Sequence, residues 1–278
     1  MDRKKKFRVD KIKKLKKENP FFLPYAKNID SLNNIYVTTK LARQGLVTLR
    51  EELKSNDPFK FEIEIPAANG MEITKEKNKS KIVEILKSSI RSELFINSLV
   101  SSISLTENYL EEIIRIVLQK HPGKLSVDID SKTKKEAQEE KKVDFKDVLS
   151  ATSLDDLYNQ IINQKLHKLF YASPADYFKY LGSIIQIKLD EDLIADYIEV
   201  KATRDLLVHN KGKVNQIYVE KAGIKARATD TRQNIPVNEE YFLNAMGTLK
   251  KIVRDSYESA SKEYLKITAK KDLYPPII

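Results

Sequence analysis

The sequence has no cysteine and only seven glycines among its 278 residues. The lack of cysteine excludes disulfide bonds and thiolate metal sites, and it fits a cytoplasmic protein. No run of about 18 apolar residues occurs, so we expect no membrane-spanning helix. The GxxxxGK[ST] and GxGxxG patterns of phosphate-binding loops are also missing. We therefore expect neither a cofactor nor a metal ion.

Most of the positive charge lies at the N-terminus. The net charge is +10, and residues 1–17 alone carry +8, because they contain ten Lys or Arg and two Asp. Such an arm can attract RNA, DNA or an acidic protein by releasing counterions. A solvated tail that aids solubility, or a weakly helical basic segment, would have the same composition. We treat residues 1–18 as a basic arm attached to a nearly neutral body.

Residues 19–78 predict an accessory region. A proline-bracketed apolar segment at 19–28 is expected to pack on the body, and a helix is expected over 31–55. Apolar and charged residues alternate strictly over 59–65, which is typical of a strand. A turn at Asn69-Gly70 would bring residues 71–74 beside it as a partner strand. A two-stranded hairpin needs support, so it should pack on helices or pair with another chain.

The remainder of the chain predicts helices. We expect a mainly all-α fold, a helical bundle with a small N-terminal β-hairpin as accessory, in which residues 79–270 form the main domain. Charged residues 122–145 predict a mobile linker or solvated insertion, and residues 271–278 form a tail. Helices are expected at 76–120 with a break between 74 and 92, at 147–172, from Pro174, from Asp190 to about Gly212, and from Asn238 to about 268. In the helix at 147–172, the side chains expected to face inward are Leu149, Leu154, Leu157, Ile161, Ile162, Leu166, Leu169 and Phe170.

The helix that begins at Asp190 carries the densest group of reactive side chains. Arg204 interrupts its apolar stripe, and a core-facing guanidinium is costly unless it meets an anion or acceptors. Asp205 and His209 are four residues apart, so they lie one above the other, and the carboxylate can orient the imidazole. Earlier in the helix an acidic row is expected to be a solvated face; its members are Asp192, Asp196 and Glu199. Glu107 on an earlier helix could pair with Arg204 or another buried cation, or remain an exposed acid.

Arg204-Asp205, three residues and then His209 resemble the R-[polar]-x-x-x-H motif of HEPN-domain proteins. The continuation Val208–Gly212 with Val214-Asn215 and Tyr218 is similar to a run in one branch of that family, and the resemblance covers roughly residues 80–270. It implies an all-helical and often ribonucleolytic domain, with Arg204 and His209 catalytic and Asp205 supporting. It also implies pairing of two motif helices across a two-fold axis, and many such proteins are toxins or antiphage-defence effectors.

Six further residues are predicted to contact substrate. Four continue the motif, and two lie in the polar stretch that follows; together they are Asn210, Lys211, Asn215, Tyr218, Lys225 and Arg227. Lys225, Arg227 and Arg232 could grip a phosphodiester backbone, although a solvated loop would have the same composition. His121 and His167 lie outside any charged constellation, and we interpret them as structural.

RNA cleavage by 2′-hydroxyl attack needs proton transfers and stabilisation of charge on phosphorus oxygens. An imidazole is suited to the first near neutral pH, and a guanidinium to the second. We therefore predict a metal-independent endoribonuclease that binds RNA and forms a homodimer through the motif helix. The predicted partner protein is an antitoxin or another component of a defence system. The alternative is a non-catalytic helical module that binds RNA or a partner protein.

Overall fold

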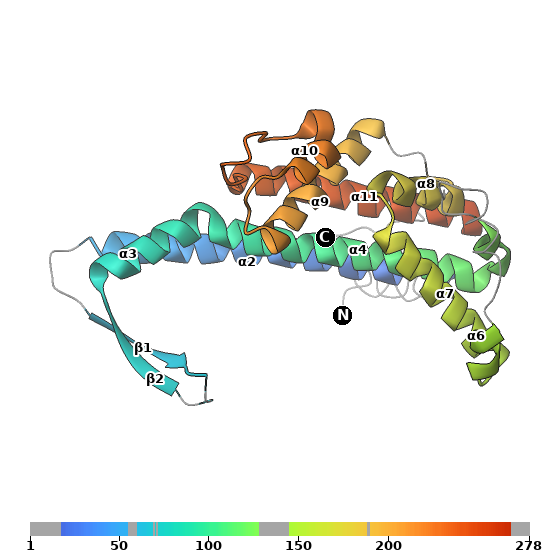
Figure 1. Ribbon diagram of the computed structural model, residues 1–278, viewed down its shortest axis with the longest axis horizontal. Helices are drawn as coiled ribbons and strands as arrows, with labels where there is room; N and C mark the ends of the chain where they lie inside the picture. The colour runs from blue at the N-terminus through green and yellow to red at the C-terminus, as the bar shows by residue number, and fades with distance from the viewer. Residues whose placement is uncertain are drawn as a thin grey trace, which may run out of the picture.

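A computed structural model describes residues 18–54, 60–68, 70, 72–127, 145–187 and 190–267. The predicted fold class is confirmed: the described chain is mainly helical, with one two-stranded hairpin (Figure 1). The basic arm, most of the charged insertion and the C-terminal tail lie outside the described residues.

Two long helical rods run side by side along the molecule (Figure 1). The first is α2, Phe22–Glu52. The second consists of α3, Lys79–Ser88, a π-helical turn at Ser89–Glu93, and α4, Leu94–Lys120. The π turn begins inside the interval 74–92, where a break was predicted, and ends one residue beyond it. The predicted packing of the apolar segment 19–28 on the body is confirmed, since Phe21 and Phe22 are buried in the main core. The helix predicted over 31–55 begins earlier, at Phe22, because proline is tolerated in the first helical turn, where Pro24 lies.

The predicted hairpin is present but projects from the body. Strands β1, Lys60–Pro66, and β2, Glu72–Asn78, are antiparallel. Asn69 lies outside the described residues, whereas Gly70 adopts φ +79° and donates its N–H to the carbonyl of Ala67 at 2.9 Å. Phe61 packs at the base against the small cluster that includes Leu86. The expected packing on helices is thus confined to that base, and Figure 1 shows the rest of the hairpin extending away.

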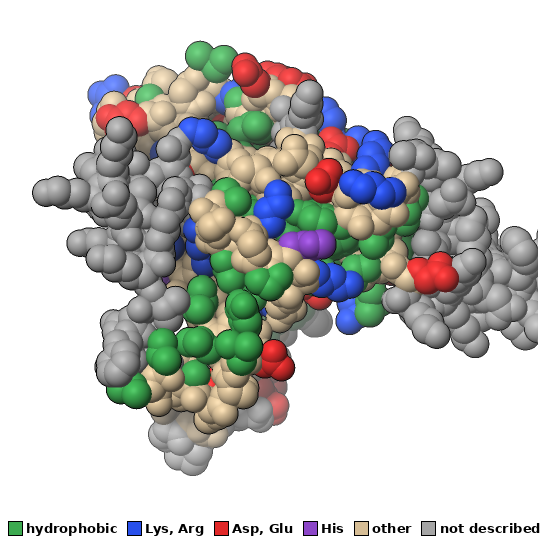
Figure 2. All heavy atoms as spheres, turned by 90° about the vertical axis from the view of Figure 1, so that its right-hand side faces the viewer, with side chains coloured by type: hydrophobic (Ala, Val, Ile, Leu, Met, Phe, Trp, Pro, Cys, Tyr) green, Lys and Arg blue, Asp and Glu red, His purple; other side chains and the backbone are tan. Residues whose placement is uncertain are grey.

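The predicted helix at 147–172 is two helices, α6, Phe145–Ser150, and α7, Leu154–Tyr171. Ser153 separates them, because its hydroxyl caps α7 by accepting from the N–H of Asp156 at 3.1 Å. Leu149 and Leu154 were predicted to face inward, which is wrong: they are 70% and 67% exposed. The buried side chains are farther along α7, at Ile162, Leu166 and Leu169. Figure 2 shows hydrophobic side chains gathered on the projecting end that α6 and the start of α7 form.

Helix α8, Pro174–Ile185, begins at the predicted residue and is capped by Ser173. Helices α9, Glu191–His209, and α10, Gln216–Ala222, follow. Helix α11, Glu239–Leu265, closes the fold. Short 3-10 helices lie at Pro122–Ser126 and Gly223–Lys225.

Helix α4 lies at the centre of the core, in contact with α2, α7, α8, α9 and α11. Leu99, Leu110 and Ile114 of α4 are inaccessible to solvent, so this helix supports the one that carries the motif. None of the helices that the structure describes is long and apolar enough to cross a membrane.

Candidate active site

The motif helix begins and ends as its sequence predicts. Asp190 caps the start of α9, accepting from the N–H of Asp192 at 3.3 Å. At the other end the N–H groups of Asn210 and Gly212 both donate to the carbonyl of Leu206 at 2.9 Å. Lys211 and Gly212 have φ of +51° and +77°, the left-handed conformation that reverses the chain after a helix. The chain therefore reverses directly after His209, and Lys211 lines a different groove from His209.

A groove of about 620 Å³ opens along the last turns of α9, and we call it the motif groove. It is lined by His209 and Arg204, together with Glu107 from α4 and Lys221 from α10. His209 is exposed and Arg204 is half-buried. The structure thus brings the motif's imidazole and guanidinium to one solvent-reachable surface, although they are five positions apart in the sequence.

Glu107 holds two cations of the motif helix. One Oε2–Nη2 contact of 2.5 Å joins it to Arg204, and its other oxygen accepts from the ammonium group of Lys201. The possible pairing of Glu107 with Arg204 is therefore confirmed. Arg204 also lies 3.3 Å from Asp205 through Nη1. A guanidinium has five N–H donors, so two carboxylates can fix its plane and still leave donors for a third group.

Asp205 faces the groove but does not orient the imidazole by a direct bond. Its carboxylate lies between Arg204 and Lys221, with 3.5 Å from Oδ2 to the ammonium nitrogen of Lys221. Among the hydrogen bonds of the described residues, none joins Asp205 to His209. The exposed imidazole therefore owes its position to the helix backbone rather than to a carboxylate partner.

Behind the groove, Glu199 is the centre of a buried hydrogen-bond network, so its predicted place on a solvated face is wrong. It is 4% exposed, and one oxygen accepts from the hydroxyls of Thr203 and Tyr218, each at 2.8 Å. The same oxygen accepts from Nε of Arg227 at 2.9 Å, and the other accepts from the Tyr241 hydroxyl at 2.8 Å. The cost of desolvation is offset because these four donors converge on the carboxylate.

The predicted substrate residues divide between different surfaces. Asn210 and Asn215 line the motif groove, and the Asn215 side chain also caps α10 by accepting from the N–H of Tyr218 at 2.9 Å. Tyr218 borders the groove with its ring, but its hydroxyl is committed to Glu199, and burial raises the pKa of Tyr218 to about 12.

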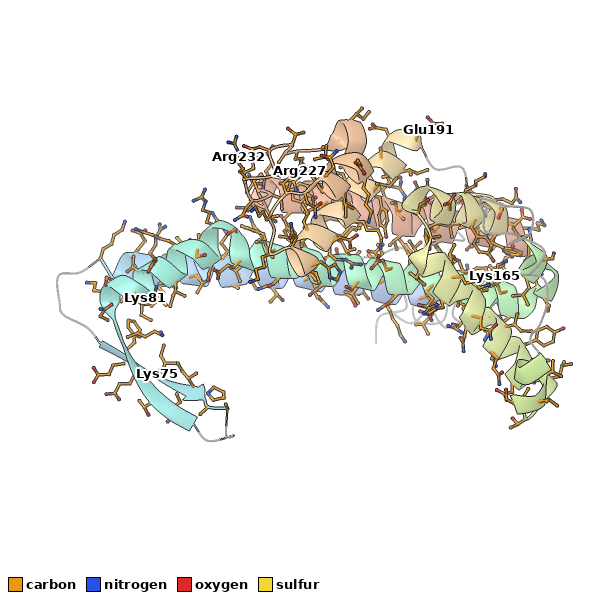
Figure 3. All side chains as sticks on the ribbon, in the orientation of Figure 1. Lys75, Lys81, Lys165, Glu191, Arg227 and Arg232 are labelled. Carbon is orange, nitrogen blue, oxygen red and sulfur yellow. The ribbon has the colours of Figure 1, made fainter. Side chains whose placement is uncertain are left out.

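Lys225 and Arg227 lie away from the motif groove. Lys225 lies 2.6 and 2.8 Å from the carboxylates of Asp192 and Asp196, and the hydrogen bonds that it donates to them raise its pKa above the usual range. Arg227 lies 3.4 Å over the ring of Tyr241 and within the Glu199 network. Figure 3 shows Arg227 among the packed side chains of this region and Arg232 at the outer end of the loop. These contacts give both cations structural partners.

Two cations of the motif groove, Lys201 and Lys221, were not predicted from the sequence as site residues. Lys201 lies three positions before Arg204, one turn away on the same helical face, so its spacing carried a usable signal. Lys221 lies on α10, and only the packing of α10 against α9 brings it to Asp205. Of the other histidines, His121 stacks on the ring of Tyr264 with centroids 4.5 Å apart, which fits a structural role, and His167 lies exposed on α7.

Carboxylate and imidazole groups do not gather into a metal site: no three His, Asp or Glu of the described chain lie close enough together to hold a metal ion. Comparison with protein-family models, curated proteins and solved structures finds no match to this chain. The geometry of the motif groove is therefore what bears on function.

Proposed function

We propose that this protein is a metal-independent endoribonuclease of the HEPN type, which cleaves RNA by attack of a 2′-hydroxyl on the adjacent phosphorus. The observation that supports this most directly is the shared groove: His209 is exposed there, and Arg204 lines the same wall. An imidazole and a guanidinium on one open surface are the groups that this chemistry requires.

In this mechanism His209 takes the proton of the 2′-hydroxyl as its oxygen attacks phosphorus. The bond from phosphorus to the 5′-oxygen breaks, and the leaving 5′-oxygen receives a proton from the imidazolium or from water. Arg204 donates to the non-bridging oxygens of the phosphoryl group, where negative charge develops in the transition state. Glu107 and Asp205 hold the guanidinium plane, so these two act as positioning residues. The ionised side chains of the groove have a net charge of +1, because its cations are Lys201, Arg204 and Lys221 and its anions are Glu107 and Asp205. A polyanion is therefore not repelled.

The proposed dimer would join two motif helices, and two exposed apolar side chains support it. Val208 on the last turn of α9 is 51% exposed, and Ile217 on α10, which lines the motif groove, is 61% exposed. Burial of such side chains between two copies is favourable by about 25 cal/mol per Å² of apolar surface. We expect Val208→Asp to shift the protein towards monomer in sedimentation experiments. Val37→Asp, at a site on α2 with 52% exposure, is the matched control and should leave the assembly unchanged.

The test of activity is incubation of the purified protein with total RNA in EDTA. The wild type should generate fragments with 2′,3′-cyclic phosphate ends, whereas His209→Ala and Arg204→Ala should not. His167→Ala, at an exposed position on α7, serves as the control and should retain cleavage. Unchanged cleavage by both motif variants would reject the site. A toxin or defence role predicts that expression of the wild type, but not of His209→Ala, arrests growth.

The alternative is a non-catalytic module that binds RNA or a partner protein. It is favoured by the engagement of Arg204 with two carboxylates, which by itself gives the guanidinium a structural role. Intact RNA in the same assay, with salt-sensitive binding that is lost when residues 1–17 are deleted, would select this alternative.

A further inference from the structure

A second groove, of about 640 Å³, lies on the other side of the motif turn, and we call it the basic groove. Three cations line it: Lys87 from α3, Arg91 from the π-helical turn and Lys211 from the turn after α9. Among the described residues that line this groove, none carries a carboxylate. Like charges in one concave surface raise its positive potential and attract anions.

These cations are available to a ligand. All three are exposed, and within the described part of the chain no ion pair joins any of them to a carboxylate. The nearest acid along the chain, Glu93, instead accepts from the hydroxyls of Ser88 and Ser89 at 2.5 and 2.8 Å. An anion entering the groove would therefore not compete with a protein carboxylate for these side chains.

Neutral hydrogen-bonding groups complete the surface. Asn234 and Asn238 line the groove beside the cations and contribute side-chain amides. Ser88 and Ser92 line it too, but their hydroxyls donate to Glu93 and to the carbonyl of Ser88. Positive side chains with hydroxyl and amide groups are the usual partners of phosphate oxygens in nucleic-acid complexes. Such a surface fits a phosphodiester backbone rather than an apolar ligand.

The two grooves share one wall. Leu206 and His209 line the motif groove, whereas Leu207, Lys211 and Gly212 line the basic groove. Lys211 lies two positions after His209, so their Cα atoms are at most about 7 Å apart. A single strand with its reacting phosphate at His209 can therefore place neighbouring phosphates at Lys211. Lys211 holds this position in a left-handed conformation that lysine seldom adopts.

We propose that the basic groove binds the backbone phosphates of single-stranded RNA next to the cleaved bond. This proposal rests on the proposed function, because that function is the reason for choosing RNA as the polyanion. Lys87, Arg91 and Lys211 bind phosphates without reading bases, and so they set the register of the strand in the motif groove.

The test measures binding of a single-stranded RNA oligonucleotide, 2′-O-methylated throughout so that it cannot be cleaved, to full-length protein over a series of salt concentrations. The variant combines Lys87→Gln, Arg91→Gln and Lys211→Asn; asparagine keeps the left-handed conformation accessible. The control combines Lys27→Gln, Lys120→Gln and Lys251→Gln, which removes three exposed charges that line neither groove. Both should unfold at the wild-type temperature.

Because each neutralised phosphate of a single strand contributes about 0.7 to the slope of log K against log salt, the groove variant should lose about 2 from that slope. The control should retain it. Equal slopes for the two variants would overturn the proposal, even if unmodified RNA is still cleaved, and the proposed function would then stand alone. A loss of slope only in the groove variant, with no cleavage of unmodified RNA by the wild type, would support the groove and reject the nuclease. Displacement of the RNA by polyglutamate at equal charge concentration would assign the groove to an acidic peptide and also overturn the proposal.

Discussion

Replacement of Glu199 tests the network that fixes the motif helix to its neighbours. This carboxylate accepts from Thr203, Tyr218, Arg227 and Tyr241, which come from α9, α10, the following loop and α11. Glu199→Ala would leave the Arg227 guanidinium and the surrounding hydroxyls without their acceptor. Glu199→Gln would keep the shape and the number of polar atoms but remove the charge.

The expected magnitudes differ between the two substitutions. Removal of one partner of a buried ion pair typically costs 3–5 kcal/mol. Arg227 retains 23% exposure of its side chain, so water can partly replace the carboxylate, and we expect about 3 kcal/mol for Glu199→Ala. A hydrogen bond to a charged group is worth about 1 kcal/mol more than a neutral one, so Glu199→Gln should cost about 1–2 kcal/mol. For a chain of this length, 3 kcal/mol lowers the melting temperature by about 5 °C.

The assay is denaturant unfolding followed by circular dichroism, with a melting curve for each variant. Asp196→Asn is the control, because Asp196 lies one turn earlier on the same helix but pairs with Lys225 at the surface. A surface pair is worth about 0–1 kcal/mol, so this control should unfold close to the wild type. Equal losses for Glu199→Ala and Asp196→Asn would refute the argument that Glu199 is a buried hub.

Two further outcomes follow from burial. On α7, Leu166→Ala should lower the free energy of unfolding by about 2–5 kcal/mol because Leu166 is buried, whereas Leu154→Ala, at the exposed end of the same helix, should change it by less than about 0.5 kcal/mol; equal effects would contradict the exposed position of Leu154. Burial raises the pKa of Tyr218 to about 12 from its ordinary value near 10, so the folded protein holds this proton more tightly than the unfolded chain. The corresponding stability is complete below about pH 10 and is lost as the pH rises towards about 12, which denaturant midpoints at increasing pH would detect, and Tyr218→Phe should reduce that loss.

The sequence by itself predicted the elements whose signals are local. The cap at Asp190 and the left-handed turn at Gly212 bounded the motif helix correctly, because caps and turns depend on side chains within a few residues. Alternation of charged and apolar residues located the first strand for the same reason. The periodicity of residues 147–172 indicated a helix correctly but not which of its leucines are covered, because the end of α7 extends beyond the helices that would bury it.

The pairing of Arg204 with Glu107, across 97 residues of sequence, was only one of the alternatives that the sequence left open, and the packing of α9 against α4 decided it. Tertiary structure likewise placed Glu199 in the interior, although its spacing from Asp196 is that of a solvated row. It also brought Lys87 and Arg91 beside Lys211 in the basic groove. Helices, turns and the local density of charge are determined by short segments of sequence. The partner of a charged side chain depends instead on which surfaces the folded core brings together.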